Sequence, residues 1–143
     1  MIGPAHHVGV AVRDLGKAVA DYRILGLEPE SVEEVPAQGV RVAFLRTGAV
    51  PIELLESLRP DGVIARFVDR SGEGLHHLAF AVQDIRAEMG RLRERGLQLV
   101  DAEPRAGARG RLVAFVHPRS AHGVLVELVQ EPAGSGGETP QHD

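Results

Sequence analysis

The sequence predicts an α+β domain in which two tandem β-α-β-β-β modules form a cup-shaped, eight-stranded mixed sheet. The first observation is a repeat, because the segment that begins at His7 recurs 70 positions later at His77. The second is that each copy continues with the same elements, one helix followed by three strand-like segments. The third is size. A module of about 70 residues with one helix buries little surface by itself, so the two copies should pack together.

The repeat keeps its register over about twenty positions. Residues 7–15 read HVGVAVRDL, and residues 77–85 read HLAFAVQDI. Gly26 and Gly96 are separated by the same 70 positions. This register indicates a duplicated module rather than two unrelated segments.

The first module is expected over about residues 5–58. A valine-rich run at 7–12 predicts a buried strand, and Asp14 is suited to cap the helix that follows. Gly26 is a natural stop for that helix. The expected apolar stripe of the helix is Leu15, Val19, Tyr22 and Leu25, and the strands that follow are expected at about 27–35, 40–47 and 51–57.

The second module is expected over about residues 74–130, after an inserted helix at about 61–70. Asp84 is the matching cap and Gly96 the matching stop. Its strands are expected at about 75–82, 97–102, 111–117 and 123–130, and its helical stripe is Ile85, Met89 and Leu92. The tail at 131–143 has little to bury, so we expect it to be disordered.

Composition excludes several classes of function. The chain has 143 residues, 43% of them hydrophobic, which suits one ordinary globular domain. A net charge of -4 and an aromatic content of 3% argue against a nucleic-acid surface. There is no long apolar run for a membrane span and no apparent export signal, so we expect a cytoplasmic protein. Because there is no cysteine, any metal must be held by nitrogen and oxygen ligands.

One histidine and one glutamate recur in each module, which is a metal-site stoichiometry. Glu53 and Glu127 each lie among aliphatic residues in a strand near the end of a module. A buried carboxylate is costly unless a cation or hydrogen bonds compensate for it. We therefore predict that the metal ligands are His7, Glu53, His77 and Glu127. This set suits one divalent cobalt, manganese, nickel, zinc or iron ion acting as a Lewis acid, with cobalt placed first.

His6 and His76 compete with His7 and His77, because each module reads His-His. Strand alternation is expected to put one member of each pair inside and the other outside. The second histidine of each pair is the one followed by the matched sequence. The small residues Gly9 and Ala11 share a face with His7 and should leave room for a ligand there.

At these residues the chain resembles the vicinal oxygen chelate superfamily and, within it, the methylmalonyl-CoA epimerase family, over about residues 5–130. The motifs that carry the closer resemblance lie at residues 14–15, 38–40, 52–55, 72–77, 103–105, 115–118 and 123–128. The resemblance implies two paired modules forming a cup around a metal. It also implies inversion at C2 of methylmalonyl-CoA, by removal of a proton next to the thioester and its return to the other face through an enediolate.

Inversion needs two acid/base groups on opposite sides of the substrate. Some members of the family carry a glutamate after Gln-Gly-Val, but this chain has Val42 there. We therefore assign Glu127 as one base and Glu53 as the other, both also serving as ligands. The resemblance further implies a CoA thioester substrate and a homodimer, with no nucleic acid or membrane partner.

The basic loop at 105–111 could meet CoA phosphates or the substrate carboxylate, and a solvated hairpin is the alternative. The residues that we expect near substrate are Gln38, Arg105, Arg111, His117 and Ser120.

Other activities of the same superfamily are alternatives. Glyoxalase I is the first, and the inserted helix at 61–70 and the segment at 115–127 favour the epimerase over it. An extradiol dioxygenase would use three ligands and iron(II), so the fourth candidate ligand, Glu53, argues against that activity. A metal-free drug-binding protein is disfavoured because all four ligand positions are filled.

Overall fold

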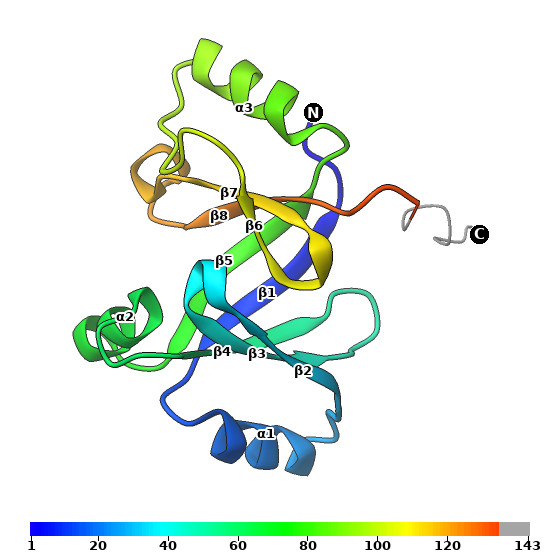
Figure 1. The fold of residues 1–143 in the computed structure, drawn as a ribbon, viewed down its shortest axis with the longest axis vertical. Coiled ribbons are helices and arrows are strands. Elements are labelled where there is room, and N and C mark those ends of the chain that lie inside the picture. The colour runs from blue at the N-terminus through cyan, green and yellow to red at the C-terminus, as the bar shows by residue number, and fades with distance from the viewer. Residues whose placement is uncertain (135–143) are drawn as a thin grey trace.

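The computed structural model describes residues 1–134, which form one eight-stranded mixed sheet in the order β2-β3-β4-β1-β5-β8-β7-β6 (Figure 1). The strands are β1 (Ala5–Ala11), β2 (Pro29–Val35), β3 (Val40–Leu45), β4 (Ile52–Ser57), β5 (Gly74–Ala81), β6 (Arg105–Ala106), β7 (Leu112–Val116) and β8 (Val126–Gln130). The α-helices are α1 (Leu15–Ile24), α2 (Val63–Ser71) and α3 (Ile85–Glu94). The predicted fold class is confirmed.

The two halves of the sheet meet at its centre. β1 and β5, the first strands of the two repeats, pair antiparallel. β4 pairs parallel with β1, and β8 pairs parallel with β5. Figure 1 shows the two halves flanking these central strands. The duplication therefore brings His7 of β1 and His77 of β5 onto neighbouring strands.

Equivalent aspartates begin the two repeated helices. The Asp14 side chain accepts a hydrogen bond from the Lys17 backbone N–H at 3.1 Å, and Asp84 accepts one from Ala87 at the same distance. α1 packs on β3 and β4, and α3 packs on β7 and β8, so each helix covers its own half of the sheet. The predicted place of Leu25 in the apolar stripe is wrong, because α1 ends at Ile24 and Leu25 is exposed.

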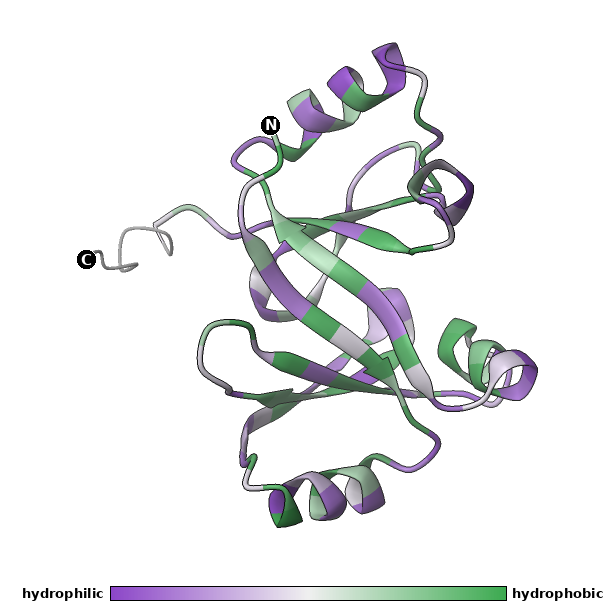
Figure 2. Cartoon of the chain, turned by 180° about the vertical axis from the view of Figure 1, so that it is seen from behind, coloured by the Kyte–Doolittle hydropathy of each residue, from purple (hydrophilic) through white to green (hydrophobic). Residues whose placement is uncertain are grey.

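Strand alternation separates the two faces of the sheet. Figure 2 shows a hydrophilic stretch on each of the two central strands, next to hydrophobic residues. On β4, Leu54 belongs to the cluster under α1, whereas Leu55 belongs to the cluster that α2 helps to cover. Ile64 and Val68 of α2 are buried in that second cluster. Glu53 alternates with Leu54 and therefore faces the inside of the cup.

The strand predicted at 97–102 is wrong. One isolated bridge, Leu99 to Val116, stands in its place, and the next strand is the two-residue β6. The Asp101 carboxylate accepts a hydrogen bond from the Phe115 N–H at 2.8 Å. Because this side chain takes a donor that a strand carbonyl would otherwise use, the backbone ladder does not continue.

Within residues 1–134, no helix has the length and apolar character needed to cross a membrane. Most of the predicted disordered tail, residues 135–143, lies outside the described residues. Glu131, which follows β8 directly, is half-buried and forms ion pairs with His6 and Arg111.

Candidate metal centre

Three of the four predicted ligands converge at the centre of the sheet. Oε1 of Glu127 lies 3.1 Å from Nε2 of His7 and 3.0 Å from Nε2 of His77, and the two Nε2 atoms are 3.0 Å apart. All three side chains are buried. Two imidazole nitrogens and one carboxylate oxygen therefore meet at one point, contributed by β1, β5 and β8.

Gly9 makes this convergence possible. It lies opposite His77 in the β1–β5 pairing. A Cβ atom at Gly9 would lie 2.1 Å from Cε1 of His77, which no real side chain tolerates. The space predicted beside His7 is thus occupied by the imidazole of His77.

The three atoms fit a divalent cation. Oε1 of Glu127 is buried and has no aligned hydrogen bond to any residue in 1–134. Burial alone raises the pKa of Glu127, but its contacts with His7 and His77 lower that pKa by more than burial raises it, so the net shift is downward and the group is a carboxylate. An ion would satisfy this oxygen and the imidazole lone pairs together, and mixed nitrogen and oxygen ligation suits several transition metals.

Glu53 stands on the other side of the His7 ring. Its Oε2 atom lies 3.4 Å from Nδ1 of His7, whereas Glu127 is on the Nε2 side. The Arg111 guanidinium donates a hydrogen bond to the same Oε2 at 2.9 Å. His7, His77 and Glu127 therefore form one cluster of candidate ligand atoms, and Glu53 lies outside it. Coordination of the metal by Glu53 stays a prediction.

His6 and His76 do not point away from the site, so that expectation is wrong. In the β1–β5 pairing, Ala5 faces Phe80 and His7 faces Ala79, which leaves His6 as an extra residue on β1. The pairing skips His76 on β5 in the same way. These β-bulges re-aim both side chains. Nδ1 of each lies against Nδ1 of the next histidine, at 2.8 Å for the first pair and 2.9 Å for the second.

The two bulged histidines have different surroundings. His6 contacts the Glu131 carboxylate through Nε2 at 2.5 Å. His76 packs edge-on against Phe67, with the ring centres 4.9 Å apart. Burial, followed by the neighbouring His77, lowers the pKa of His76 from 6.5 to about 4. His76 is therefore neutral at physiological pH.

A cavity of about 310 Å³ opens beside the metal cluster. Glu53 and Glu127 both line it, as do the predicted substrate residues Gln38 and Arg105. Nε2 of Gln38 is buried and has no hydrogen-bond partner in the described part of the chain. It is therefore a donor available to a bound oxygen. Val42, at the position where some family members carry a glutamate, lines the same cavity with an apolar side chain.

Arg111, His117 and Ser120 do not line this cavity, and their contact with substrate stays a prediction. Arg111 is buried against Glu53 and Glu131. Nδ1 of His117 accepts a hydrogen bond from the Arg119 N–H at 3.0 Å. Oγ of Ser120 accepts one from the Gln98 N–H at 2.8 Å. The hydrogen bonds of His117 and Ser120 hold the loop between β7 and β8 in place.

Two acidic residues escaped the sequence interpretation. Asp101 lines the cavity and pairs with Nε of Arg105 at 2.9 Å. Glu131 pairs with His6 and Arg111. Asp101 was hidden within the expected strand and Glu131 within the expected tail, so neither carried a local signal.

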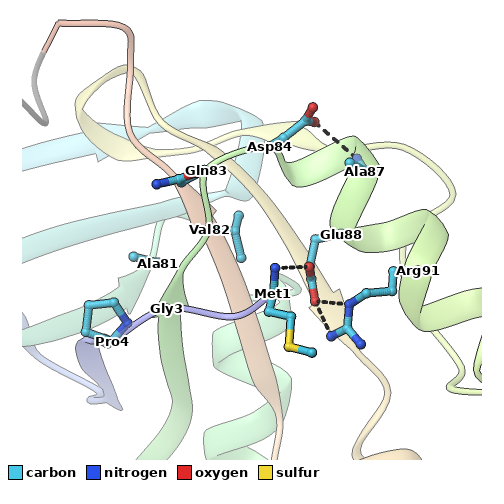
Figure 3. Close-up of a pocket in the computed structure, with 10 residues that line it drawn as sticks. All are labelled: Met1, Gly3, Pro4, Ala81, Val82, Gln83, Asp84, Ala87, Glu88 and Arg91. Carbon is cyan, nitrogen blue, oxygen red and sulfur yellow. Dashed lines mark hydrogen bonds and ion pairs between the residues drawn. The ribbon is translucent and has the colours of Figure 1, made fainter.

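A larger hollow, of about 680 Å³, lies between the N-terminal residues and α3 (Figure 3). Its buried acid is Glu88, whose Oε2 accepts a hydrogen bond from Nε of Arg91 at 3.1 Å, while Oε1 lies 3.1 Å from the Met1 nitrogen. Both carboxylate oxygens already have partners. This hollow exceeds the cup cavity in volume but contains no converging ligand group, so we assign the chemistry to the cup.

Comparisons with known proteins show the family to which the chain belongs. Residues 6–115 match the family model of the glyoxalase/bleomycin resistance protein/dioxygenase superfamily. The ethylmalonyl-CoA/methylmalonyl-CoA epimerase of Cereibacter sphaeroides is 41% identical, over 91% of this chain and 99% of that protein. The mitochondrial methylmalonyl-CoA epimerase of Homo sapiens is 38% identical, over 90% of this chain and 74% of that protein.

Solved structures give the same result. The methylmalonyl-CoA epimerase of Streptomyces coelicolor, in complex with 2-nitronate-propionyl-CoA, superposes with a TM-score of 0.87 at 36% identity, covering 93% of this chain and 97% of that one. The methylmalonyl-CoA epimerase of Mycobacterium tuberculosis gives a TM-score of 0.85 at 37% identity, covering 93% and 91%. The chain therefore belongs to the glyoxalase/bleomycin resistance protein/dioxygenase superfamily, and within it is similar to methylmalonyl-CoA epimerases along most of its length.

Proposed function

We propose that the protein is an epimerase that inverts C2 of methylmalonyl-CoA by removing a proton from one face and returning it to the other. The observation that carries this proposal is the pair of buried carboxylates, Glu53 and Glu127, in the wall of one cavity beside a candidate metal cluster. Relatives that are 38% and 41% identical bear the name of this activity.

His7, His77 and Glu127 would hold the ion, and Glu53 is the proposed fourth ligand. When bound, a divalent metal supplies Lewis-acid stabilisation of the negative charge that develops on the thioester and carboxylate oxygens. We propose cobalt first, with manganese, nickel, zinc or iron as alternatives.

The residues of the chain supply the proton transfer. We assign Glu127 as the base on one face of the substrate and Glu53 as the base on the other. One carboxylate removes the C2 proton, and the partner on the opposite face, in its protonated form, donates a proton to C2, which completes the inversion; the two roles exchange for the other epimer. Gln38 has a free buried N–H to offer a substrate oxygen, and Asp101 orients Arg105 toward a substrate carboxylate. Apolar walls beside these groups exclude water from the reacting carbon.

A neighbouring groove suits the CoA part of the substrate. It has a volume of about 540 Å³ and shares Val63, His76 and Leu125 with the cup cavity. Arg66 and Arg70 of α2 line it and are exposed. Neither forms an ion pair with another residue of the described chain, so both charges are available to phosphate groups.

The decisive experiment is incubation of metal-loaded protein with single-epimer methylmalonyl-CoA in heavy water. We expect inversion together with incorporation of deuterium at C2. Turnover of a glutathione hemithioacetal without exchange at C2 would instead favour glyoxalase I. A homodimer and a cytoplasmic location stay predictions, and light scattering on the purified protein tests the first.

A further inference from the structure

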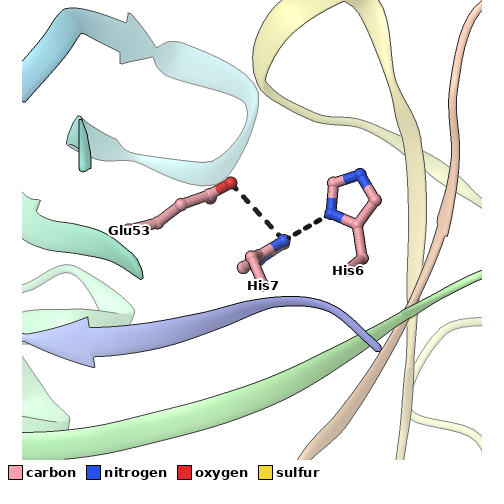
Figure 4. Close-up of side chains that lie close together, drawn as sticks. All are labelled: His6, His7 and Glu53. Carbon is pink, nitrogen blue, oxygen red and sulfur yellow. Dashed lines mark hydrogen bonds and ion pairs between the residues drawn. The ribbon is translucent and has the colours of Figure 1, made fainter. Parts of the chain in front are cut away.

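A closed ring of charged and polar side chains lies behind the candidate metal cluster. Figure 4 shows its first part, in which His7 lies between His6 and Glu53. Arg111 donates to Glu53 at 2.9 Å and lies 3.2 Å, through Nε, from Glu131. The ring closes at His6, which contacts both Glu131 and Nδ1 of His7.

Two distant parts of the sequence build this ring. His6 and Glu53 come from the first module, whereas Arg111 and Glu131 flank the β7–β8 pair of the second. The register of that pair places Leu112 opposite Gln130, so the residues one step further out, Arg111 and Glu131, meet at its end. The bulge in β1 then turns His6 toward Glu131.

The ring sets the tautomer of His7. The ionised Glu131 carboxylate can accept a hydrogen bond but cannot donate one, so Nε2 of His6 carries the proton in that contact. In a neutral His6 ring, Nδ1 then presents a lone pair, and Nδ1 of His7 donates a hydrogen bond to it. This leaves the lone pair of His7 on Nε2, the atom that faces His77 and Glu127. Such outer partners commonly orient metal-binding histidines.

The same geometry speaks against a second metal site. His6, His7 and Glu53 also bring ligand-type atoms close together, on the Nδ1 side of His7. The Arg111 guanidinium already supplies a positive charge to Glu53. A second cation there would be repelled by the guanidinium and would have to displace its hydrogen bond.

We propose that Arg111, Glu131 and His6 form a positioning network that fixes the tautomer of His7 and the orientation of Glu53 for the metal centre. Arg111 is its central member because, among residues 1–134, it is the side chain that contacts both Glu53 and Glu131. The inference rests on the metal centre of the proposed function. Its test uses metal binding, which can be measured without an epimerase assay.

The experiment is a titration of metal-free protein with Co²⁺, followed by visible absorption. Loss of a partner that orients a metal ligand typically weakens metal affinity by about tenfold to a hundredfold. We expect that loss, together with a changed cobalt spectrum, for Arg111→Met. Arg111→Lys should recover part of the affinity, because an ammonium group can keep one of the two ion pairs.

Arg91→Met is the matched control. It breaks another contact between an arginine and a buried glutamate, Glu88, at a distance from the cup. Its cobalt affinity should stay within about twofold of the wild type even where its stability falls. If Arg111→Met does not fold, Glu131→Ala gives the same test at a half-exposed position, with the same expected direction.

The outcomes separate two failures. Wild-type affinity and spectrum in both Arg111→Met and Glu131→Ala would overturn the network while leaving the metal centre intact. A wild-type protein that binds no cobalt, manganese, nickel, zinc or iron would overturn the metal centre, and the network with it.

Discussion

The two halves of the candidate site carry the same residue types in different settings. In the first half, Glu53 is held by Arg111, and His6 is backed by Glu131. In the second half, His76 packs against Phe67, and Oε1 of Glu127 has no aligned hydrogen bond to any described residue. The charged supports of the first half are supplied by the second module. The assembled site therefore needs residues from both modules.

The difference suggests a division of labour between the two glutamates. Glu53 is constrained by a guanidinium, whereas the ion-pair partners of Glu127 within the described part of the chain are the imidazoles of His7 and His77. Duplication supplied two equivalent carboxylates, and their surroundings made them unequal. The predictions that follow test this inequality and the geometry on which it depends.

The largest effect is expected from Glu127→Gln. The amide keeps an oxygen that can bind metal weakly but loses basicity, so proton transfer should fall by about a hundredfold to ten-thousandfold. Deuterium incorporation from each epimer, measured separately in Glu127→Gln and Glu53→Gln, tells which face each residue serves. Near-wild-type epimerisation by metal-loaded Glu127→Gln would remove its assignment as a base.

The next effect is expected from Gly9→Ala, which attacks the contact between the two halves. The new methyl group would meet the His77 imidazole at 2.1 Å, so His77 must leave its place beside His7. We expect metal affinity to fall by about tenfold or more, as for a displaced ligand. Gly16→Ala is the control. Its Cβ meets the Asp14 side chain at an ordinary 3.5 Å, and it should bind metal like the wild type.

A smaller effect is expected from Arg66→Ala combined with Arg70→Ala. Loss of two exposed charges should raise KM for the CoA thioester by about tenfold and leave kcat nearly unchanged, because uniform binding is lost. Arg23→Ala removes an exposed arginine from α1, away from the groove, and serves as the reference. A fall in kcat with unchanged KM would contradict a role in CoA binding.

The smallest effect concerns stability and is expected at the Arg91–Glu88 pair, which lies away from the candidate site. The hydrogen bond from Arg91 lowers the pKa of Glu88 below its ordinary 4.5, against the opposing effect of burial. Its contribution is therefore present above pH 4.5 and is lost as the pH falls through the lower pKa of the folded protein. Thermal unfolding of Glu88→Gln should lose part of this dependence on acid pH. An unchanged profile of Tm against pH would show that the pair contributes nothing.

Much of the fold could be predicted from local patterns. Asp14 and Asp84 cap equivalent helices because each places an oxygen where the first helical N–H groups have no partner. Glu53 and Glu127 faced inward because side chains alternate along a strand. These rules act over a few residues and can be read directly from the chain.

The rest depended on pairing between distant strands. The sequence determined the duplicated modules and the residue types of the metal centre. Only the tertiary structure decided that His6 and His76 are bulged toward the site, and that Arg111 and Glu131 support Glu53 and His7. A bulge shifts the facing of a side chain by one step, and an ion pair needs two chain segments to meet. Both depend on the register between strands that lie far apart in the sequence, which no local pattern specifies.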